Sequence, residues 1–431
     1  MQNFQNTFEF AQELDKNDAL APLREQFYIP NKNGKPVIYF CGNSLGLQPK
    51  NVREYIEVEL QKWQTLGVEA HFAGEPRWYD YHKSLKPALC HLLGCFPHEV
   101  TIMNNLTANL HILFTTFYRP TPQRYKILIE SPTFPSDYYA IESQIQNAGF
   151  DPKNALIEVF PDINSETISI KHLLQTIEQH REQLAIVFFG AVNYYTGQFF
   201  DLPAIVQKAH EVGAYAGFDL AHAIGNVPLY LHKIEADFAT WCSYKYLNSG
   251  AGGVSGIYIH EKYATNTSLP RLAGWFGYDE NERFLMKKGF KAIPTADGWL
   301  QSNFPILQMA VHRASLKIFE QITIEQLRQK SIQLTNFAEY VIEQAIQASE
   351  RKDIYIITPK NPNERGCQLS IAIEHNGKTI YKQLKENNII VDWREPKIIR
   401  LAPVPLYNTF QEVYYFGQVL TSILQNSLVS V

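Results

Sequence analysis

Cysteine is scarce in this sequence. The 431 residues include five, Cys41, Cys90, Cys95, Cys242 and Cys367, and no two of them form a Cys-x-x-Cys pair. Disulfide-stapled folds and zinc sites need paired ligands at short, regular spacing. The spacing argues against both classes, so we expect free thiols, no metal site and a protein of the reducing cytoplasm.

An excess of one charge is also lacking, as are long apolar runs. Lys plus Arg is 39 and Asp plus Glu is 43, which gives a formal net charge of −4. Nucleic-acid binding requires clustered basic residues, so we expect no nucleic-acid partner. No run approaches the roughly 18 apolar residues of a membrane span. Residues 1–20 lack the basic start and apolar stretch of a signal peptide, so we expect neither membrane insertion nor secretion.

Apolar residues, by contrast, are plentiful. Hydrophobic side chains make up 45% of the chain and aromatic ones 13%, which excludes a disordered protein. Between about residues 100 and 260, short apolar runs alternate with amphipathic stretches, a pattern that indicates a largely parallel sheet covered by helices. The expected strands are 125–129, 184–189, 214–218, 238–242 and 254–259, and the expected helices are 135–147, 170–182 and 202–211.

The rest of the chain predicts a smaller α+β unit. A long helical pattern over 306–349 precedes expected strands at 354–358, 368–373 and 389–392 around a helix at 379–387. At roughly 150 residues per domain, the length fits two to three domains. We therefore expect an N-terminal arm (1–50) that packs on the small domain, a large domain (51–310) and a small C-terminal domain (311–431).

Two polar residues follow successive apolar strands of the expected sheet. Asp219 ends the run AYAGF, and Lys245 follows FATWC and precedes a glycine-rich stretch. Taken singly, such an aspartate is more often a helix cap or ion-pair partner, and such a lysine is more often solvated. Ligands of open α/β sheets bind at the carboxyl ends of strands. The pair therefore indicates one pocket, in which a carboxylate keeps a pyridine nitrogen protonated and an amine forms a Schiff base.

Hydroxyl-bearing residues open two expected helices. Thr107, after Leu106, lies at the start of one helix, and Ser136 begins another, so both sites offer free N–H groups to an anion. Ordinary helix capping explains such residues about equally often. Tyr244 has two interpretations, since it can donate its phenol to the same phosphate or be a core tyrosine.

Several longer strings resemble the kynureninase family of fold-type-I pyridoxal 5′-phosphate (PLP) enzymes. They are YFCGNSLGLQPK (39–50), SPTFPSDYYAIESQIQ (131–146), YYTGQ (194–198), GFDLAHAIGNVPLYLH (217–232), WCSYKYLNSGAGG (241–253), GWFG (274–277) and RLAPVPLYNTF (400–410). The resemblance runs from about residue 35 to 415. It implies a large domain with a mostly parallel seven-stranded sheet, a small α+β domain, and a homodimer with its active site at the subunit interface.

The reaction that the resemblance implies is hydrolytic Cβ–Cγ cleavage of L-kynurenine or 3-hydroxy-L-kynurenine. The products are anthranilate or 3-hydroxyanthranilate plus L-alanine, on the route from tryptophan to NAD. Lys245 would hold PLP as a Schiff base and take the α-proton, Asp219 would pair with the ring nitrogen, and Tyr244 would donate or relay a proton. The family's cofactor positions correspond to Leu106, Thr107, Phe134, Pro135, Ser136, Asp137, Asp219, His222, Tyr244, Lys245, Trp275 and Asn303, with Trp275 and Asn303 reaching from the partner subunit.

The resemblance also implies substrate contacts. Arg400 would grip the α-carboxylate, a bidentate task that suits a guanidinium group. Ser44, His71, Ser302 and Asn303 match the branch of the family that favours the 3-hydroxylated substrate. There, His71 would stack on the aromatic ring and Asn303 would bond the 3-hydroxyl; the alternative for His71 is a plain polar loop residue.

One departure from the family pattern lies at Gly190, where some relatives carry serine. Compared with those relatives, the chain lacks a hydroxyl group near the cofactor's phosphate or ring, which puts its affinity for PLP in question. Other functions remain open: an aminotransferase or cysteine desulfurase on the same fold, a PLP-binding regulatory protein without turnover, and an α/β domain with coincidental polar strand ends. A desulfurase needs a nucleophilic cysteine near the lysine, for which Cys242 and Cys367 are the candidates.

Overall fold

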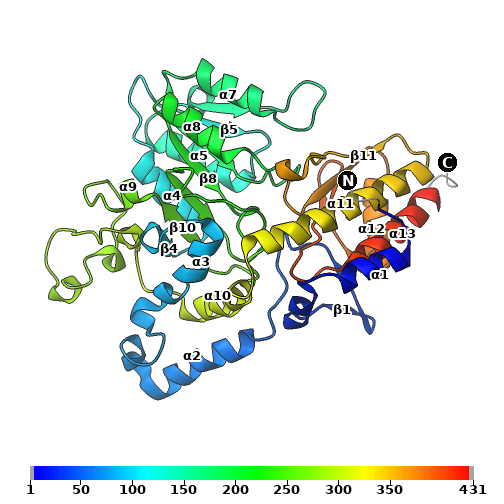
Figure 1. Cartoon of the computed structure of the whole chain (residues 1–431). Coiled ribbons are helices and arrows are strands. Elements are labelled where there is room, and N and C mark those ends of the chain that lie inside the picture. Colours follow the sequence, from blue (N-terminus) through cyan, green and yellow to red (C-terminus); the bar gives the residue numbers. More distant parts are fainter. Residues whose placement is uncertain (1–3, 427–431) are drawn as a thin grey trace.

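The computed structural model describes residues 4–426, which form two lobes around separate sheets (Figure 1). The larger lobe contains a seven-stranded sheet in which β10 runs antiparallel to both its neighbours and the other strands run parallel. In spatial order its strands are β4 (Val100–Ile102), β10 (Gly256–Ile259), β9 (Phe238–Trp241), β8 (Tyr215–Asp219), β7 (Leu184–Gly190), β5 (Lys126–Glu130) and β6 (Leu156–Val159). The expected seven-stranded, mostly parallel sheet is confirmed.

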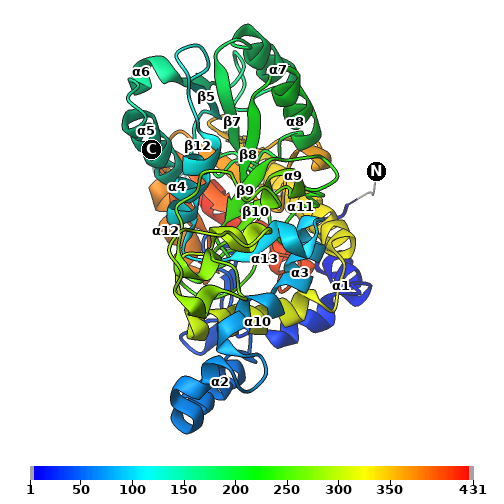
Figure 2. The ribbon, with the colours of Figure 1, turned by 90° about the vertical axis from the view of Figure 1, so that its left-hand side faces the viewer.

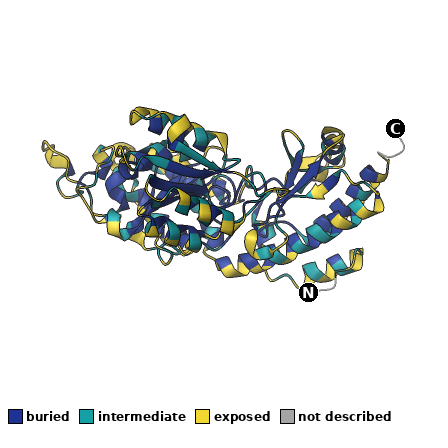
Figure 3. Ribbon diagram, turned by 90° about the horizontal axis from the view of Figure 1, so that it is seen from above, coloured by how far each residue is buried: buried dark blue, intermediate teal, exposed yellow. Residues whose placement is uncertain are grey.

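Helices cover this sheet because its central strands are apolar on both faces. Ile186 to Phe189 of β7 are at most 1% exposed, and Phe117 stacks on Phe238 with ring centroids 4.5 Å apart. The helices of this lobe are α3 (Lys86–Leu93), α4 (Leu106–Phe117), α5 (Pro135–Asn147), α6 (Pro152–Ala155), α7 (Ile170–Gln179), α8 (Leu202–Glu211) and α9 (Glu261–Ala264). Seen from above, the sheet lies inside and the outward helix faces are exposed (Figure 3).

A helix pair and several short turns extend the large lobe. α2 (Val52–Leu66) packs against α10 (Ile306–Phe319) and projects from the body (Figure 2). The 3₁₀ turns of this region are η2 (Gly67–His71), η3 (Trp78–Ser84), η4 (Pro97–Glu99), η5 (Trp275–Gly277), η6 (Arg283–Leu285) and η7 (Ala296–Trp299).

The smaller lobe combines both ends of the described chain. Its four-stranded antiparallel sheet has the order β11 (Ile354–Ile356), β12 (Leu369–Ile373), β15 (Ile398–Leu401) and β14 (Asp392–Arg394). Its helices are α11 (Ile324–Ala348), α12 (Gly377–Glu386) and α13 (Phe410–Asn426), with α1 (Phe8–Lys16) packed on α13. From the N-terminal segment, β3 (Ile38–Tyr39) pairs in parallel with β13 (Ile389–Ile390). The remaining elements are the η1 (Ala21–Gln26) and η8 (Pro362–Glu364) turns and a hairpin of β1 (Asn31–Lys32) and β2 (Lys35–Pro36).

The long helix expected over 306–349 is wrong as a single element, because α10 ends at Phe319 and α11 begins at Ile324. Thr323 caps α11, and Gln326 completes a capping box with it, which starts a new helix at that point. The proposed division at 310 stays a prediction. Within α11, the buried hydrophobic side chains up to Leu327 belong to the core of the large lobe, and those from Leu334 belong to the core of the small lobe.

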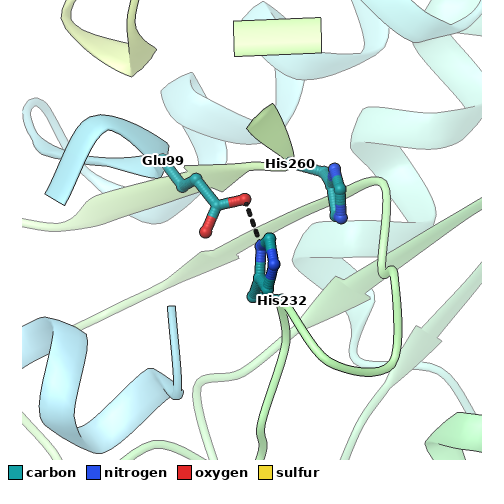
Figure 4. Close-up of side chains that lie close together, drawn as sticks. All are labelled: Glu99, His232 and His260. Atoms are coloured by element: carbon teal, nitrogen blue, oxygen red, sulfur yellow. Dashed lines mark hydrogen bonds and ion pairs between the residues drawn. The ribbon is translucent and has the colours of Figure 1, made fainter. Parts of the chain in front are cut away.

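Glu99 links three segments of the large lobe (Figure 4). Its Oε1 lies 3.0 Å from His232 Nδ1 and accepts from Glu261 N at 2.8 Å, and its Oε2 accepts from Phe96 N at 2.9 Å. The rings of His232 and His260 are stacked at 10°, 5.1 Å apart, so their in-plane lone pairs do not converge on one point. We therefore interpret this cluster as structural rather than as a metal site.

No helix within residues 4–426 is both long and apolar enough to span a bilayer.

Candidate active site

Lys245 lies in the loop after β9, and its side chain points into a buried pocket. The residue is 9% exposed, and its Nζ lies 3.0 Å from His222 Nε2 and 5.7 Å from the centre of the Phe134 ring. Burial and the charge of Lys245 lower the pKa of His222 well below its usual range. A neutral His222 therefore accepts a hydrogen bond from the lysine amine, which holds the amine at a fixed point in the pocket.

Two aspartates lie on the other side of this pocket. Asp219 ends β8, and its Oδ1 accepts a hydrogen bond from Ala221 N at 2.8 Å. Asp137 of α5 is hydrogen-bonded to Asp219. Burial raises the pKa of both carboxyl groups, and Asp219 raises the pKa of Asp137 further, while Lys245 lowers both. Burial and the neighbouring charge of Asp219 therefore favour the protonated form of Asp137, which has an O–H to donate to Asp219.

The N-termini of α4 and α5 meet at the opposite end of the pocket. Thr107 Oγ1 lies 2.7 Å from Ser136 Oγ. Asn105 caps α4 by accepting from Ala108 N at 3.1 Å, so the Thr107 hydroxyl is not needed as a cap. No side chain caps α5, which begins with Pro135. Free backbone N–H groups and two hydroxyls at converging helix dipoles form an anion site.

Tyr244 completes the wall between these groups. Burial and its hydrogen bond to Cys242 raise the pKa of the Tyr244 phenol, so the hydroxyl stays protonated and is available as a donor. Nine of the predicted residues line this one pocket: Leu106, Thr107, Phe134, Ser136, Asp137, Asp219, His222, Tyr244 and Lys245. Pro135 lies beside them as the first residue of α5.

Arg400 adjoins the pocket from β15 of the small lobe. It is 1% exposed, and its Nε and Nη2 donate to the two oxygens of Asp392 at 2.7 and 2.6 Å. Its Nη1 donates to the carbonyl of Tyr194, a residue that lines the pocket, at 2.6 Å. Ser44 Oγ donates to Asp392 at 2.9 Å. The predicted pair of Ser44 and Arg400 is thus brought together around a third residue.

Four predicted residues lie away from the Lys245 pocket. His71 ends η2 and contacts Trp78 edge to face, with centroids 5.5 Å apart. Trp275 is 43% exposed, packs against Phe284 and lines a separate surface groove. Asn303, with Ser302, lines another surface pocket beside Asn105. Within one chain, none of these side chains borders the Lys245 amine.

Two residues of this region were missed by the sequence reasoning. Glu130 ends β5 and lines the Lys245 pocket; a carboxylate at the end of an apolar strand, the signal that identified Asp219, could have found it. Asp392 ends the expected strand 389–392 and carries the same signal, but that signal does not give its partner. Its pairing with Arg400 depends on the register of β14 and β15, in which the two residues are opposite one another.

Comparison with known proteins places the chain in one family. The family model of the kynureninase C-terminal domain matches residues 327–420. Kynureninase of Flavobacterium psychrophilum is 46% identical over 98% of this chain and 100% of that protein, and the human kynureninase is 44% identical over 96% and 92%.

Solved structures agree on the fold. The Escherichia coli cysteine desulfurase CsdA superposes with a TM-score of 0.74 at 16% identity, covering 95% of this chain and 98% of that one. The cystine C–S lyase C-DES, in a variant with glycine linked covalently to its PLP cofactor, gives 0.73 at 18% identity, covering 89% and 96%. The fold is therefore that of the fold-type-I PLP enzymes, and the full-length identity shows that the chain belongs to the kynureninase family.

Proposed function

We propose that this chain is a PLP-dependent hydrolase that cleaves the Cβ–Cγ bond of L-kynurenine or 3-hydroxy-L-kynurenine. The products are anthranilate or 3-hydroxyanthranilate and L-alanine, within tryptophan breakdown and NAD biosynthesis. Membership of the kynureninase family supports the reaction. The single observation that carries it is the convergence of the Lys245 amine, the Asp219 carboxyl group and two helix N-termini on one pocket.

The groups in the pocket fit PLP chemically. PLP has a phosphate, a basic ring nitrogen and an aldehyde, and the pocket offers two helix N-termini, a carboxyl pair and an amine. Buried polar atoms without a partner among residues 4–426 also point to a bound ligand: Oδ1 of Asp137, Nδ1 of His222 and Oε2 of Glu130. Buried polar groups are normally hydrogen-bonded in proteins, so we expect the cofactor to satisfy some of these.

Each residue has a task that follows from its position. Bound PLP supplies a protonated ring that stabilises negative charge at the reacting carbon of the substrate. Asp219 holds the proton on the ring nitrogen, with Asp137 fixing its orientation. Lys245 acts as the base for the α-proton, and neutral His222, 3.0 Å away, keeps the amine directed into the pocket. Tyr244, whose phenol stays protonated, is the proposed proton donor.

The substrate carboxylate is assigned to Arg400. The guanidinium group is already oriented by Asp392 and by the Tyr194 carbonyl, so binding needs little ordering of this side chain.

Tyr244→Phe tests the proposed proton donor. We expect the steady-state rate to fall about tenfold or more with little change in KM, and an unchanged rate would remove Tyr244 from this role.

We further propose that two chains form a homodimer in which Trp275 and Asn303 reach the neighbouring pocket. Support comes from their position outside the chain's own Lys245 pocket. It also comes from exposed apolar side chains nearby, since Phe284 is 52%, Leu285 61% and Met286 71% exposed. Exposed apolar patches mark interfaces between proteins. Sedimentation analysis should give a dimer, and a monomer with full activity would contradict this arrangement.

For the substrate, we propose a preference for the 3-hydroxylated form. Asn303 would bond the 3-hydroxyl, and His71, which also lies outside the chain's own Lys245 pocket, would stack on the aromatic ring from the neighbouring chain. A site that bonds a hydroxyl discriminates against the analogue without it, because its polar groups are left unpaired. Asn303→Ala should therefore lower kcat/KM for 3-hydroxykynurenine more than for kynurenine, and equal losses on both substrates would contradict the proposal.

Product analysis tests the reaction itself. The purified protein with PLP should release fluorescent anthranilate from kynurenine together with alanine in equal amounts. Lys245→Ala should lose at least about a thousandfold in kcat and should not form the covalent yellow complex with PLP. A keto acid product would instead identify an aminotransferase, and PLP binding without any product would identify a regulatory protein.

A cysteine desulfurase is disfavoured by the surroundings of its two candidate cysteines. Cys242 and Cys367 are 2% and 0% exposed. Burial raises the pKa of Cys242, and it raises the pKa of Cys367 to about 12. A desulfurase needs an accessible thiolate, and neither residue provides one.

A further inference from the structure

Glu130 is a third acidic residue in the wall of the Lys245 pocket. It ends β5 and is 3% exposed. Its Oε1 accepts a hydrogen bond from Gly190 N at 3.0 Å, whereas its Oε2 is buried without a partner among residues 4–426. A buried oxygen that lines a ligand pocket and has no partner in the chain is a candidate contact for the ligand.

The surroundings of Glu130 are crowded with acids. Asp219 of β8, Asp137 of α5 and Tyr194 in the loop after β7 titrate around it, and Lys245 is the one amine that lines the same pocket. Burial first and the charge of Asp219 second raise the pKa of Glu130 to about 8, although the Gly190 N–H lowers it. Near neutral pH the carboxyl group therefore carries a proton and has an O–H to donate.

Gly190 provides the space for this carboxyl group. It ends β7 directly opposite Asp219 in the register of β8. A Cβ atom at this position would lie 2.8 Å from Glu130 Oε1, closer than such atoms normally approach. A side chain at 190 would therefore displace the Glu130 carboxyl group, so the glycine and the glutamate must be considered together.

We propose that Glu130 is a cofactor-positioning residue whose protonated carboxyl group donates a hydrogen bond to the ring oxygen of PLP, in place of the hydroxyl that Gly190 lacks. The inference rests on the proposed PLP-dependent function. The other polar groups of PLP already have partners there: the nitrogen has Asp219, the aldehyde has Lys245 and the phosphate has the helix N-termini. The ring oxygen is the remaining acceptor. His222 Nδ1 and the Glu130 carboxyl group are both buried donors without a partner among residues 4–426, and Glu130 is the one that fills the space beside Gly190.

Titration of cofactor-free protein with PLP, followed by absorbance and fluorescence quenching, tests this role without turnover. Glu130→Ala should weaken PLP binding about tenfold at pH 7, the value of one hydrogen bond. Glu130→Gln should bind within about threefold of the original protein, because an amide can donate to PLP and accept from Gly190. Glu130→Ala with Gly190→Ser should recover most of the loss. Glu158→Gln on the neighbouring strand β6 is the matched control and should bind normally.

The pH dependence provides a second measurement. Above about pH 8 Glu130 loses its proton, so the affinity of the original protein for PLP should fall, and this part of the fall should be absent in Glu130→Gln. Asp219, Asp137 and Tyr194 titrate in both proteins, so the comparison isolates the part of the fall that requires the Glu130 carboxyl group, including its effect on the pKa values of Asp137 and Tyr194.

Distinct outcomes identify which idea fails. If Glu130→Gln loses as much affinity as Glu130→Ala, the group acts as an anion and the inference is wrong. It is also wrong if Glu130→Ala binds PLP normally, or if Glu130→Gln keeps the full pH dependence. If Glu130→Ala does not fold by circular dichroism, the pH profile of Glu130→Gln decides alone. Failure of the unaltered protein to bind PLP would instead overturn the proposed function.

Discussion

Two buried clusters of ionisable side chains in the large lobe differ in charge balance: one matches its acid with an amine, and the other has more acids than amines. In the first, Asp297 of η7 accepts from Lys86 Nζ at 2.7 and 2.8 Å, and His82 Nε2 lies 3.4 Å away. Burial opposes ionisation of Asp297, but His82 and Lys86 together lower the pKa of its carboxyl group below the ordinary value. Here one acid is matched by one amine, and the pair ties η7 to α3.

In the second cluster, Asp219, Asp137 and Glu130 face the single amine of Lys245, and the pKa of each of the three carboxyl groups is raised. A surplus of buried acid is unfavourable for the folded chain alone and becomes favourable when a cationic ring is bound. The comparison teaches that matched buried charges serve the fold, whereas unmatched ones with raised pKa values mark a site for a ligand.

Lys86→Met should give the largest effect on stability. It leaves Asp297 as an unpaired buried charge, and we expect a loss of about 3–5 kcal/mol in the free energy of unfolding. Urea denaturation followed by circular dichroism measures it. The double variant Lys86→Met with Asp297→Leu should recover most of the loss, because the charge is then removed. A loss below about 1 kcal/mol in Lys86→Met would show that the pair is not needed by the fold.

Asp219→Asn should lower activity without lowering stability, whereas Lys86→Met should lower stability. Without the carboxylate, the ring proton is no longer held, and we expect kcat/KM for 3-hydroxykynurenine to fall about a hundredfold. The stability of the cofactor-free protein should not fall, because one of three crowded acids has been removed. The same urea and kinetic measurements apply. If Asp219→Asn were strongly destabilised and kept its activity, the contrast between the two clusters would be lost.

His312 of α10 is a third buried ionisable group, and we expect it to have a smaller effect on stability. It is fully buried, neither ring nitrogen has a partner among residues 4–426, and burial lowers its pKa from 6.5 to about 3. Below pH 6.5 the unfolded chain binds a proton on this histidine, whereas the folded protein keeps the ring neutral. The free energy of unfolding is therefore highest above pH 6.5 and falls as the pH falls toward 3. At pH 5 the loss is about 2 kcal/mol.

His312→Leu should therefore remove that part of the acid sensitivity. Urea midpoints at pH 7 and pH 5 should differ less in the variant than in the original protein. His98, which is partly exposed and paired with Glu261 at 3.1 Å, serves as the control through His98→Leu. An equal acid loss in His312→Leu and the original protein would contradict the assignment.

The sequence predicted the bounds of some helices that begin at a proline or a capping residue. α5 and α8 begin and end where expected, because Pro135 and the Asp201 cap start them within amphipathic runs. β4 and β15 were not predicted; each has only three or four residues, too few for a clear period. The break before α11 was missed because apolar spacing continues through it, although the capping box at Thr323 was visible.

The site residues show the same difference between what local sequence order predicts and what it does not. Asp219 and Lys245 were found because parallel strands end at one edge of a sheet, so order along the chain gives proximity in space. The contact of Arg400 with Asp392 required strand register, which no local pattern contains. In the proposed homodimer, Trp275 and Asn303 meet the pocket of a second chain, and neither the sequence pattern nor the fold of one chain determines such an arrangement.

α11 is a single helix shared by both lobes, with Leu327 in one core and Leu334 in the other. One residue of an α-helix turns the chain by about 100°. A single insertion between these leucines would rotate one apolar stripe away from its core while the other stayed in place. The number of residues in this helix therefore helps to fix how Arg400 of the small lobe lies relative to the Lys245 pocket, and with it the spacing of the proposed carboxylate and cofactor sites.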